Sequence, residues 1–155
     1  MKSLYIETTI PSLATSKPSR DMIIAGRQAT TIFFWESERH KYDLYTSQYV
    51  MDECLQGDIE AAKRRLKFLE GITIISRSEQ ISGLANEYQK LLNMPDKSKI
   101  DCFHLAVCVI SKMDYLMSWN CTHLGINTFI RIQKYNEVNS LLTPVLLTPE
   151  ALLEI

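Results

Sequence analysis

The sequence is poor in glycine and proline, with five of each among 155 residues. This scarcity excludes collagen-like and low-complexity chains. The sequence also lacks any run that approaches the roughly 18 apolar residues of a membrane-spanning helix, and its N-terminal apolar segment is too short for a signal peptide. With 46% hydrophobic and 23% charged residues, the composition is that of a globular protein. We therefore expect a soluble cytoplasmic protein without membrane contact, in one domain that covers residues 1–155.

An excess of charge of one sign is also absent. The chain has 17 lysine and arginine residues against 18 aspartate and glutamate residues, which gives a net charge of −1. No overall field therefore attracts nucleic acid, and a polyanionic partner must be held by local contacts. The basic segment KRRLK at 63–67 is explained more simply as a solvated helix face than as a phosphate-binding patch.

Cysteine is scarce as well, and the four cysteines form no C-x-x-C pair. Three of them lie among apolar residues, which is typical of free buried thiols in a reducing compartment. The pattern C-x-H occurs twice, at Cys102 with His104 and at Cys121 with His123. Residues two apart on a helix point about 200° apart and cannot grip one ion together, so the pattern does not favour a zinc site.

Short β-rich segments alternate with longer helical segments along the chain. We expect strands at 3–6, 43–46, 72–75, 115–118 and 145–147. We expect a loop at 12–21, after the breaker Pro11, and helices at 22–38, 47–55, 59–70, 78–93, 98–112, 127–138 and 151–153. This alternation predicts an α/β fold, a three-layer α/β/α sandwich with a central parallel sheet of about five strands.

Parallel α/β folds bind ligands at the carboxyl ends of their strands, where this sequence lacks the usual motifs. It has no GxGxxG, GxxxxGK[ST] or GxSxG, which removes support for dinucleotide enzymes, P-loop NTPases and α/β-hydrolases. Carboxylates stand there instead: Glu7 follows the first strand, Glu53 lies in the helix after the second, and Asp101 lies in the first turn of a later helix. Three carboxylates within a few Å repel unless a divalent cation such as Mg²⁺ or Mn²⁺ neutralises them. This carboxylate chemistry is typical of metal-dependent nucleases.

Each of the three acids also has a simpler structural explanation. The spacing S-x-x-D that ends at Asp101 matches a helix capping box, and on spacing alone capping is favoured. Glu53 stands beside Asp52 in a polar turn of helix, where a solvated acid is an equal alternative to a ligand. Glu7 is the hardest to explain in this way, because an unpaired charge at the mouth of a buried strand is costly.

Four segments together carry a more specific pattern than any single acid. They are LYIETT at 4–9, SQYVMDE at 47–53, KIDCFHLA at 99–106 and YLMSWN at 115–120. In order and spacing, across nearly the whole chain, they resemble the PIN domain, a compact α/β nuclease fold whose bacterial members include the VapC-type toxins.

The resemblance implies that Glu7, Glu53 and Asp101 ligate Mg²⁺ or Mn²⁺. The family tends to carry a threonine or serine and then a fourth acid after the fourth strand, where this chain has Ser118 and Asn120. Two departures stand out. Glu7 is longer than the usual aspartate, and Asn120 carries no charge, which predicts weaker metal binding.

Other polar residues near these segments are candidates for substrate contacts. Thr8, Thr9 and Ser118 are candidates to hydrogen-bond metal-bound water or a backbone phosphate, with ordinary strand-end polarity as the alternative. Arg20, in the loop after the second proline, is a candidate bidentate phosphate donor, with a surface ion pair as the alternative.

Two ring side chains near the acids favour structural roles. We interpret His104, three residues after Asp101 on one helix, as a satisfied, half-buried histidine, because the chemistry needs no imidazole. Trp119 and His123 are both candidates to stack on an RNA base, but for Trp119 packing within the protein is favoured.

The leading hypothesis is therefore a Mg²⁺- or Mn²⁺-dependent endoribonuclease of PIN type that cleaves single-stranded RNA. Glu7, Glu53 and Asp101 would hold the ion, with Ser118 and Asn120 completing the catalytic site. The resemblance also implies a homodimer, and we expect the run Phe33-Phe34-Trp35 to be exposed and available for such a contact. It further implies a toxin that pairs with a small antitoxin protein. The alternative is a catalytically weak or inactive PIN-fold module that binds RNA or protein. The uncharged side chain of Asn120 favours this alternative, and the three acids oppose it.

Overall fold

The computed structural model describes residues 1–93, 99–120 and 125–155. Its strands form one parallel sheet in the order β3-β2-β1-β4-β5, which confirms the predicted parallel sheet of five strands. The strands are β1 (Lys2–Ile6), β2 (Tyr42–Ser47), β3 (Thr73–Ile75), β4 (Tyr115–Met117) and β5 (Val145–Leu147).

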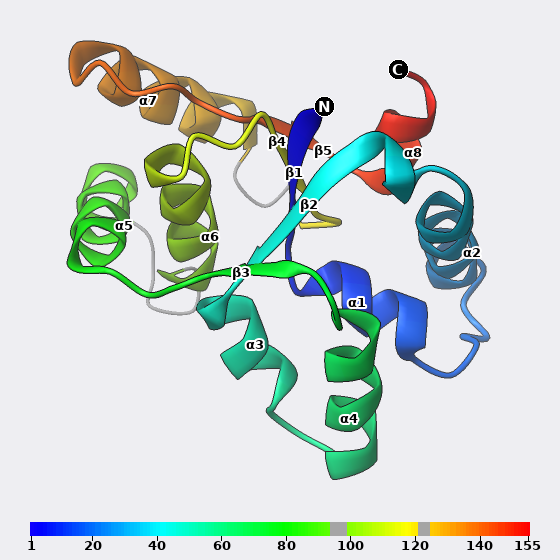
Figure 1. The fold of residues 1–155 in the computed structure, drawn as a ribbon. Helices are drawn as coiled ribbons and strands as arrows, with labels where there is room; N and C mark the ends of the chain where they lie inside the picture. The colour runs from blue at the N-terminus through cyan, green and yellow to red at the C-terminus, as the bar shows by residue number, and fades with distance from the viewer. Residues whose placement is uncertain (94–98, 121–124) are drawn as a thin grey trace.

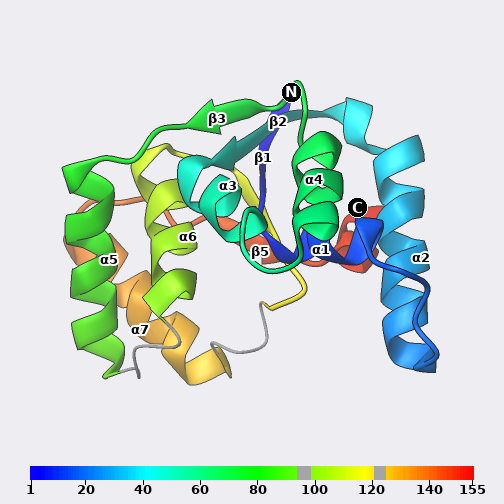
Figure 2. The ribbon, with the colours of Figure 1, turned by 90° about the horizontal axis from the view of Figure 1, so that it is seen from below.

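Helices lie on both faces of the sheet, as the alternating pattern predicts. Figures 1 and 2 show α5, α6 and α7 together on one side, with α1, α2 and α8 on the other. None of the helices in the described parts of the chain has both the length and the apolar character that a bilayer-spanning helix needs. The helices are α1 (Thr9–Thr15), α2 (Met22–Ser37), the short 3₁₀ helix η1 (Arg39–Lys41), α3 (Gln48–Cys54), α4 (Ile59–Phe68), α5 (Glu79–Leu92), α6 (Lys99–Ile110), α7 (Gly125–Val138) and α8 (Pro149–Leu153).

The central strand β1 positions the carboxyl edge of the sheet. Leu4, Tyr5 and Ile6 are fully buried, which explains the continuous apolar run of this strand between two helix layers. From β1 the sheet continues through β2 to β3 on one side and through β4 to β5 on the other, so the strand order reverses between β1 and β4. Such a reversal opens a crevice at the carboxyl ends of the two strands, and Glu7 and Ser118 directly follow them.

Helices α3, α5 and α8 each begin with a side-chain cap. Ser47 accepts a hydrogen bond from the backbone N–H of Val50, and Ser78 and Thr148 do the same for the residues three positions after them. The last helix begins at Pro149, two residues earlier than predicted, because proline fits the first helical position, where no N–H is needed. Ser98, the cap predicted for α6, lies outside the described residues.

The predicted loop at 12–21 is wrong in its first part, because α1 spans Thr9–Thr15. Pro11 lies in the first turn of this helix, where the backbone nitrogen has no intrahelical partner, so it does not break the helix. Ile10 and Pro11 are buried, and α1 packs against α2 and α4. The chain therefore enters a helix two residues after Glu7, so Thr9 lies at the helix start.

The expected exposed run of aromatic residues on α2 is also wrong in part. Phe33 is 57% exposed, whereas Phe34 and Trp35 are buried. The Trp35 ring stacks on Phe68 of α4, with ring centres 4.1 Å apart. The run therefore contributes one exposed aromatic side chain rather than three.

The expectation of free, buried thiols is confirmed for Cys54, Cys102 and Cys108. Burial raises the pKa of Cys54 and of Cys102 to about 11, so both are protonated thiols at neutral pH and poor nucleophiles. Cys121 and His123 lie outside the described residues.

Much of the basic segment at 63–67 in α4 serves the fold. The Arg65 guanidinium donates to the carbonyl oxygens of Cys54 and Gln56, and Arg64 donates to the carbonyl of Thr15. These contacts tie α4 to its neighbours, which favours the structural interpretation of the segment over a phosphate-binding patch.

Candidate carboxylate site

A pocket of about 400 Å³ lies at the carboxyl edge of the central strands. Glu7, Glu53 and Asp101 all line it, although they come from the end of β1, from α3 and from α6. A second pocket of about 20 Å³, with room for about one water molecule, shares Glu7, Asp101 and Asn120 with the first and is also lined by Ser118. The fold therefore brings the three predicted acids to one place.

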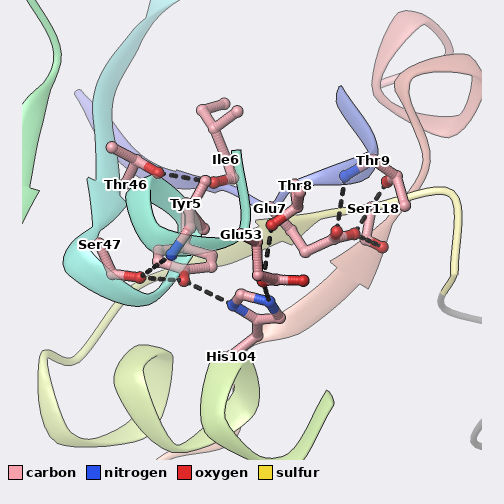
Figure 3. A network of polar contacts seen from close by, with 11 residues as sticks. Tyr5, Ile6, Glu7, Thr8, Thr9, Thr46, Ser47, Glu53, His104 and Ser118 are labelled. Carbon is pink, nitrogen blue, oxygen red and sulfur yellow. Dashed lines mark hydrogen bonds and ion pairs between the residues drawn. The ribbon is translucent and has the colours of Figure 1, made fainter. Parts of the chain in front are cut away.

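The Glu7 carboxylate is buried and held by hydrogen bonds (Figure 3). Its oxygens accept from the backbone N–H of Thr9 at 2.6 Å, from the Thr9 hydroxyl at 2.8 Å and from the Ser118 hydroxyl. Burial raises the pKa of Glu7, while the nearby positive charge of His104 and these hydrogen bonds oppose that rise. The carboxylate orientation is therefore fixed jointly by the start of α1 and by the segment after β4.

Glu53 is held by a second set of contacts, which includes His104 (Figure 3). One carboxylate oxygen accepts from the Thr8 hydroxyl at 2.7 Å and lies 2.6 Å from His104 Nε2. The other ring nitrogen, Nδ1, lies 2.9 Å from the Tyr5 hydroxyl, which is 2.7 Å from the Ser47 hydroxyl. The sequence interpretation of His104 as satisfied is confirmed, but the ring is buried rather than half-buried and contacts a candidate ligand directly.

The charge of His104 reflects its carboxylate surroundings. Burial disfavours the charged ring, but the hydrogen bond to Glu53 and the nearby carboxylates of Glu7, Glu53 and Asp101 outweigh this effect and raise the pKa of His104. Through its contacts with Tyr5 and Glu53, the imidazole links the core of β1 and β2 to the acidic pocket. The spacing of these residues in the sequence did not show this connection.

Asp101 and Asn120 complete the acidic end of the pocket. Asp101 is half-buried in the first turn of α6 and lines both pockets. Asn120 lines both pockets too, and its backbone N–H donates to the Ser118 hydroxyl at 2.9 Å. The position at which the PIN pattern carries a fourth acid therefore faces the same space as the three acids.

The candidate substrate residues are placed differently from one another. The hydroxyls of Thr8, Thr9 and Ser118 donate to the carboxylates of Glu53 and Glu7, so in this structure they orient acids. Arg20 is exposed and is not among the described residues that line the larger pocket. Arg27 of α2, which the sequence analysis did not single out, lines that pocket.

The donor set of the pocket suits a hard divalent cation. Carboxylate and amide oxygens are the ligands that Mg²⁺ prefers, and Mg²⁺ is commonly bound by one or two carboxylates while it keeps several waters. Within residues 1–93, 99–120 and 125–155, no group of three or more His, Cys, Asp or Glu side chains is arranged to hold a metal ion. The fit to a divalent cation therefore rests on the oxygen donors that line the pocket and not on a preformed ligand cluster.

Two solved structures have a similar fold. VapBC2 from Rickettsia felis, bound to a DNA fragment from its promoter, matches with a TM-score of 0.59 and 14% identity over 94% of this chain and 97% of that chain. VapC20 from Mycobacterium tuberculosis, a toxin that cleaves the sarcin–ricin loop, matches with a TM-score of 0.52 and 16% identity over 74% of this chain and 87% of that chain. No protein-family model and no curated protein sequence matches the chain. The chain thus has the PIN-like α/β/α fold of the VapC structures, as its sequence pattern implies.

Proposed function

We propose that the protein is an endoribonuclease that hydrolyses phosphodiester bonds of single-stranded RNA with the help of Mg²⁺ or Mn²⁺. The observation that carries this proposal is the presence of Glu7, Glu53 and Asp101 around one pocket at the carboxyl edge of the sheet. The shared fold of VapC20, a toxin that cleaves the sarcin–ricin loop, supports the same class of reaction.

Glu7, Glu53 and Asp101 would hold the ion. When bound, such an ion neutralises the carboxylates, lowers the pKa of water and stabilises the charge that develops on the phosphate. The protein's own contribution is to fix the acids in advance: Thr9 and Ser118 orient Glu7, while Thr8 and His104 orient Glu53. Groups that are already oriented need no reorganisation during the reaction, which is the main advantage of a folded site over water.

The test is cleavage of a fluorescent single-stranded RNA, and of a DNA of the same sequence, after metal removal with EDTA and return of Mn²⁺ or Mg²⁺. Asp101→Asn keeps the side-chain size but removes the charge, and we expect cleavage to fall by on the order of 100-fold or more. Any loss of a capping role costs only about 1 kcal/mol, so the variant stays folded.

The matched control is Asp52→Asn. Asp52 lies on α3 next to Glu53, but it pairs with Gln48 and Arg77 and does not line the pocket. We expect this variant to cleave RNA as the unmodified protein does. Absence of cleavage with either metal, or equal cleavage by the Asp101→Asn protein, would contradict the proposed function.

A second function, that of an RNA-binding module with little or no catalysis, is favoured by one observation. Asn120 faces the pocket where the PIN pattern carries an acid, so the pocket has one negative charge fewer for an ion. RNA binding measured by fluorescence anisotropy, together with the absence of metal-dependent cleavage, would select this alternative.

We also propose that the protein acts in the cytoplasm as a homodimer and has a small antitoxin protein as a partner. Exposed apolar side chains on α2, among them Met22, Ile23 and Phe33, support a protein contact there. The fold shared with VapBC2 supports an antitoxin partner. Co-expression with the product of a neighbouring reading frame is expected to give a complex in which RNA cleavage is suppressed; a frame whose product neither co-purifies nor inhibits would contradict this pairing.

A further inference from the structure

The larger pocket is lined by a basic side chain as well as by acidic ones. Of the described residues that line it, Arg27 is the one lysine or arginine. Its guanidinium carbon lies 5.3 Å from the centre of the Trp119 ring, within the range of a cation–π contact. Within the described residues Arg27 forms no ion pair, although three acids line the same pocket.

Thr31, which is completely buried, connects Trp119 to the turn of α2 that carries Arg27. The indole Nε1–H donates to the Thr31 hydroxyl at 2.8 Å, and this hydroxyl donates to the carbonyl oxygen of Arg27 at 2.6 Å. The backbone N–H of Trp119 donates to the Thr9 hydroxyl at 3.0 Å, and the same hydroxyl donates to Glu7. Trp119 is therefore fixed to α2 through its ring and to the acidic end of the pocket through its backbone.

We propose that Arg27 and Trp119 form a subsite that binds a backbone phosphate of the RNA next to the scissile bond, with Thr31 as the positioning residue. This inference rests on the proposed function for the identity of the substrate. A guanidinium that lies over an aromatic ring keeps its N–H groups available to phosphate oxygens, and it pairs with phosphate in a bidentate manner.

The charges of the pocket favour phosphate binding at Arg27 rather than at the acids. Without a bound cation the carboxylates repel the phosphates of an RNA strand, whereas Arg27, which lines the same pocket, attracts them. Trp119 adds an aromatic surface, and contacts of this kind tolerate any base. The subsite therefore contributes affinity and placement of the strand rather than sequence preference, because phosphate contacts carry no sequence information directly.

The test measures RNA binding separately from RNA cleavage. Binding of a fluorescent single-stranded RNA is followed by anisotropy in an Asp101→Asn background, with and without Arg27→Gln, between 50 and 200 mM salt. We expect Arg27→Gln to weaken binding roughly tenfold and to lower the slope of log K against log salt by about 0.7, the value for one phosphate contact on a single strand. In the otherwise unmodified protein, we expect the same substitution to raise KM and to leave kcat within about twofold.

The chain offers a matched control in Arg39→Gln. The Arg39 guanidinium carbon lies 4.9 Å from the centre of the Trp35 ring, so the pair has the same chemistry, but it does not line the pocket. We expect Arg39→Gln to change neither RNA affinity nor its salt dependence. Equal behaviour of Arg27→Gln and Arg39→Gln would overturn the subsite, even in a protein that cleaves RNA.

The role of Thr31 has its own pair of variants. Thr31→Val removes the hydroxyl bridge and is expected to lower RNA affinity, whereas Thr31→Ser keeps the hydroxyl and is expected to retain it. Equal loss in both variants would contradict the positioning role. If RNA binding depends on Arg27 but no cleavage occurs, the subsite stands and the nuclease function fails. If the protein binds no RNA at all, both proposals fail.

Discussion

Replacing His104 by phenylalanine is expected to lower the free energy of unfolding by about 2–4.5 kcal/mol. Phenylalanine keeps a ring of similar size at a position that is 3% exposed, so no large cavity opens. The substitution removes the contacts to Glu53 at 2.6 Å and to the Tyr5 hydroxyl at 2.9 Å. A hydrogen bond to a charged group contributes about 1.5–3 kcal/mol and a neutral one about 0.5–1.5 kcal/mol. Because Tyr5 keeps Ser47 and Glu53 keeps Thr8 as partners, the lower half of this range is favoured.

The assay is urea unfolding at pH 7, with an unchanged m-value as the sign that the same surface is exposed. His40→Phe is the matched control, because His40 is exposed in η1 and a surface change costs at most about 0.5 kcal/mol. We also expect the folded His104→Phe protein to bind Mn²⁺ more weakly, since Glu53 loses the ring that orients it. A loss of stability no larger than that of the control would refute the view that His104 ties the acidic pocket to the core.

Asn120→Asp is expected to tighten Mn²⁺ binding about tenfold in calorimetry, because a carboxylate adds a full charge to the ligand set; an unchanged affinity would make Asn120 a purely structural residue. The hydrogen bond from the Ser3 backbone and the contact with Lys2 lower the pKa of Asp114. Asp114 therefore contributes stability above its unfolded pKa of about 3.9, and this contribution is lost as the pH falls through the lower folded pKa. Asp114→Asn should therefore flatten the pH dependence of urea unfolding below about pH 4, and an unchanged profile would argue against the contribution. Sedimentation at micromolar concentration is expected to show a dimer that Phe33→Glu dissociates, whereas a monomeric unmodified protein would refute the homodimer.

The sheet and most helices could be predicted because their signals are local. Buried parallel strands have sequences with short apolar runs. Helix starts are indicated by Ser47, Ser78 and Thr148, each of which accepts a hydrogen bond from the residue three positions later. The sequence does not predict α1, because a proline is typical of a helix break, although it is tolerated in a first helical turn, where Pro11 lies. The difference between a break and a first turn depends on where the helix begins, which the packing of α1 decides.

Glu7 could be predicted to lie at the carboxyl edge of the sheet because it directly follows β1, whereas the role of Asp101 in α6 was implied by the PIN resemblance and not by its spacing. The residues that hold or extend the site depend on contacts between distant parts of the chain: His104 meets Glu53 across 51 positions, and Trp119 meets Thr31 across 88. One local signal was available, since Arg27 and Thr31 are four residues apart on one helix and therefore share a face. That spacing does not show which surface the face meets.

Calorimetric titration of the metal-free protein with Mn²⁺ tests the central claim, that the pocket lined by Glu7, Glu53 and Asp101 binds a catalytic cation. We predict saturable binding at that pocket in the unmodified protein, the same affinity in the Asp52→Asn control, and an affinity at least roughly tenfold weaker in Asp101→Asn, which loses a charged ligand. An Asp101→Asn protein that binds Mn²⁺ as tightly as the unmodified protein, or an unmodified protein that binds none, would contradict the account.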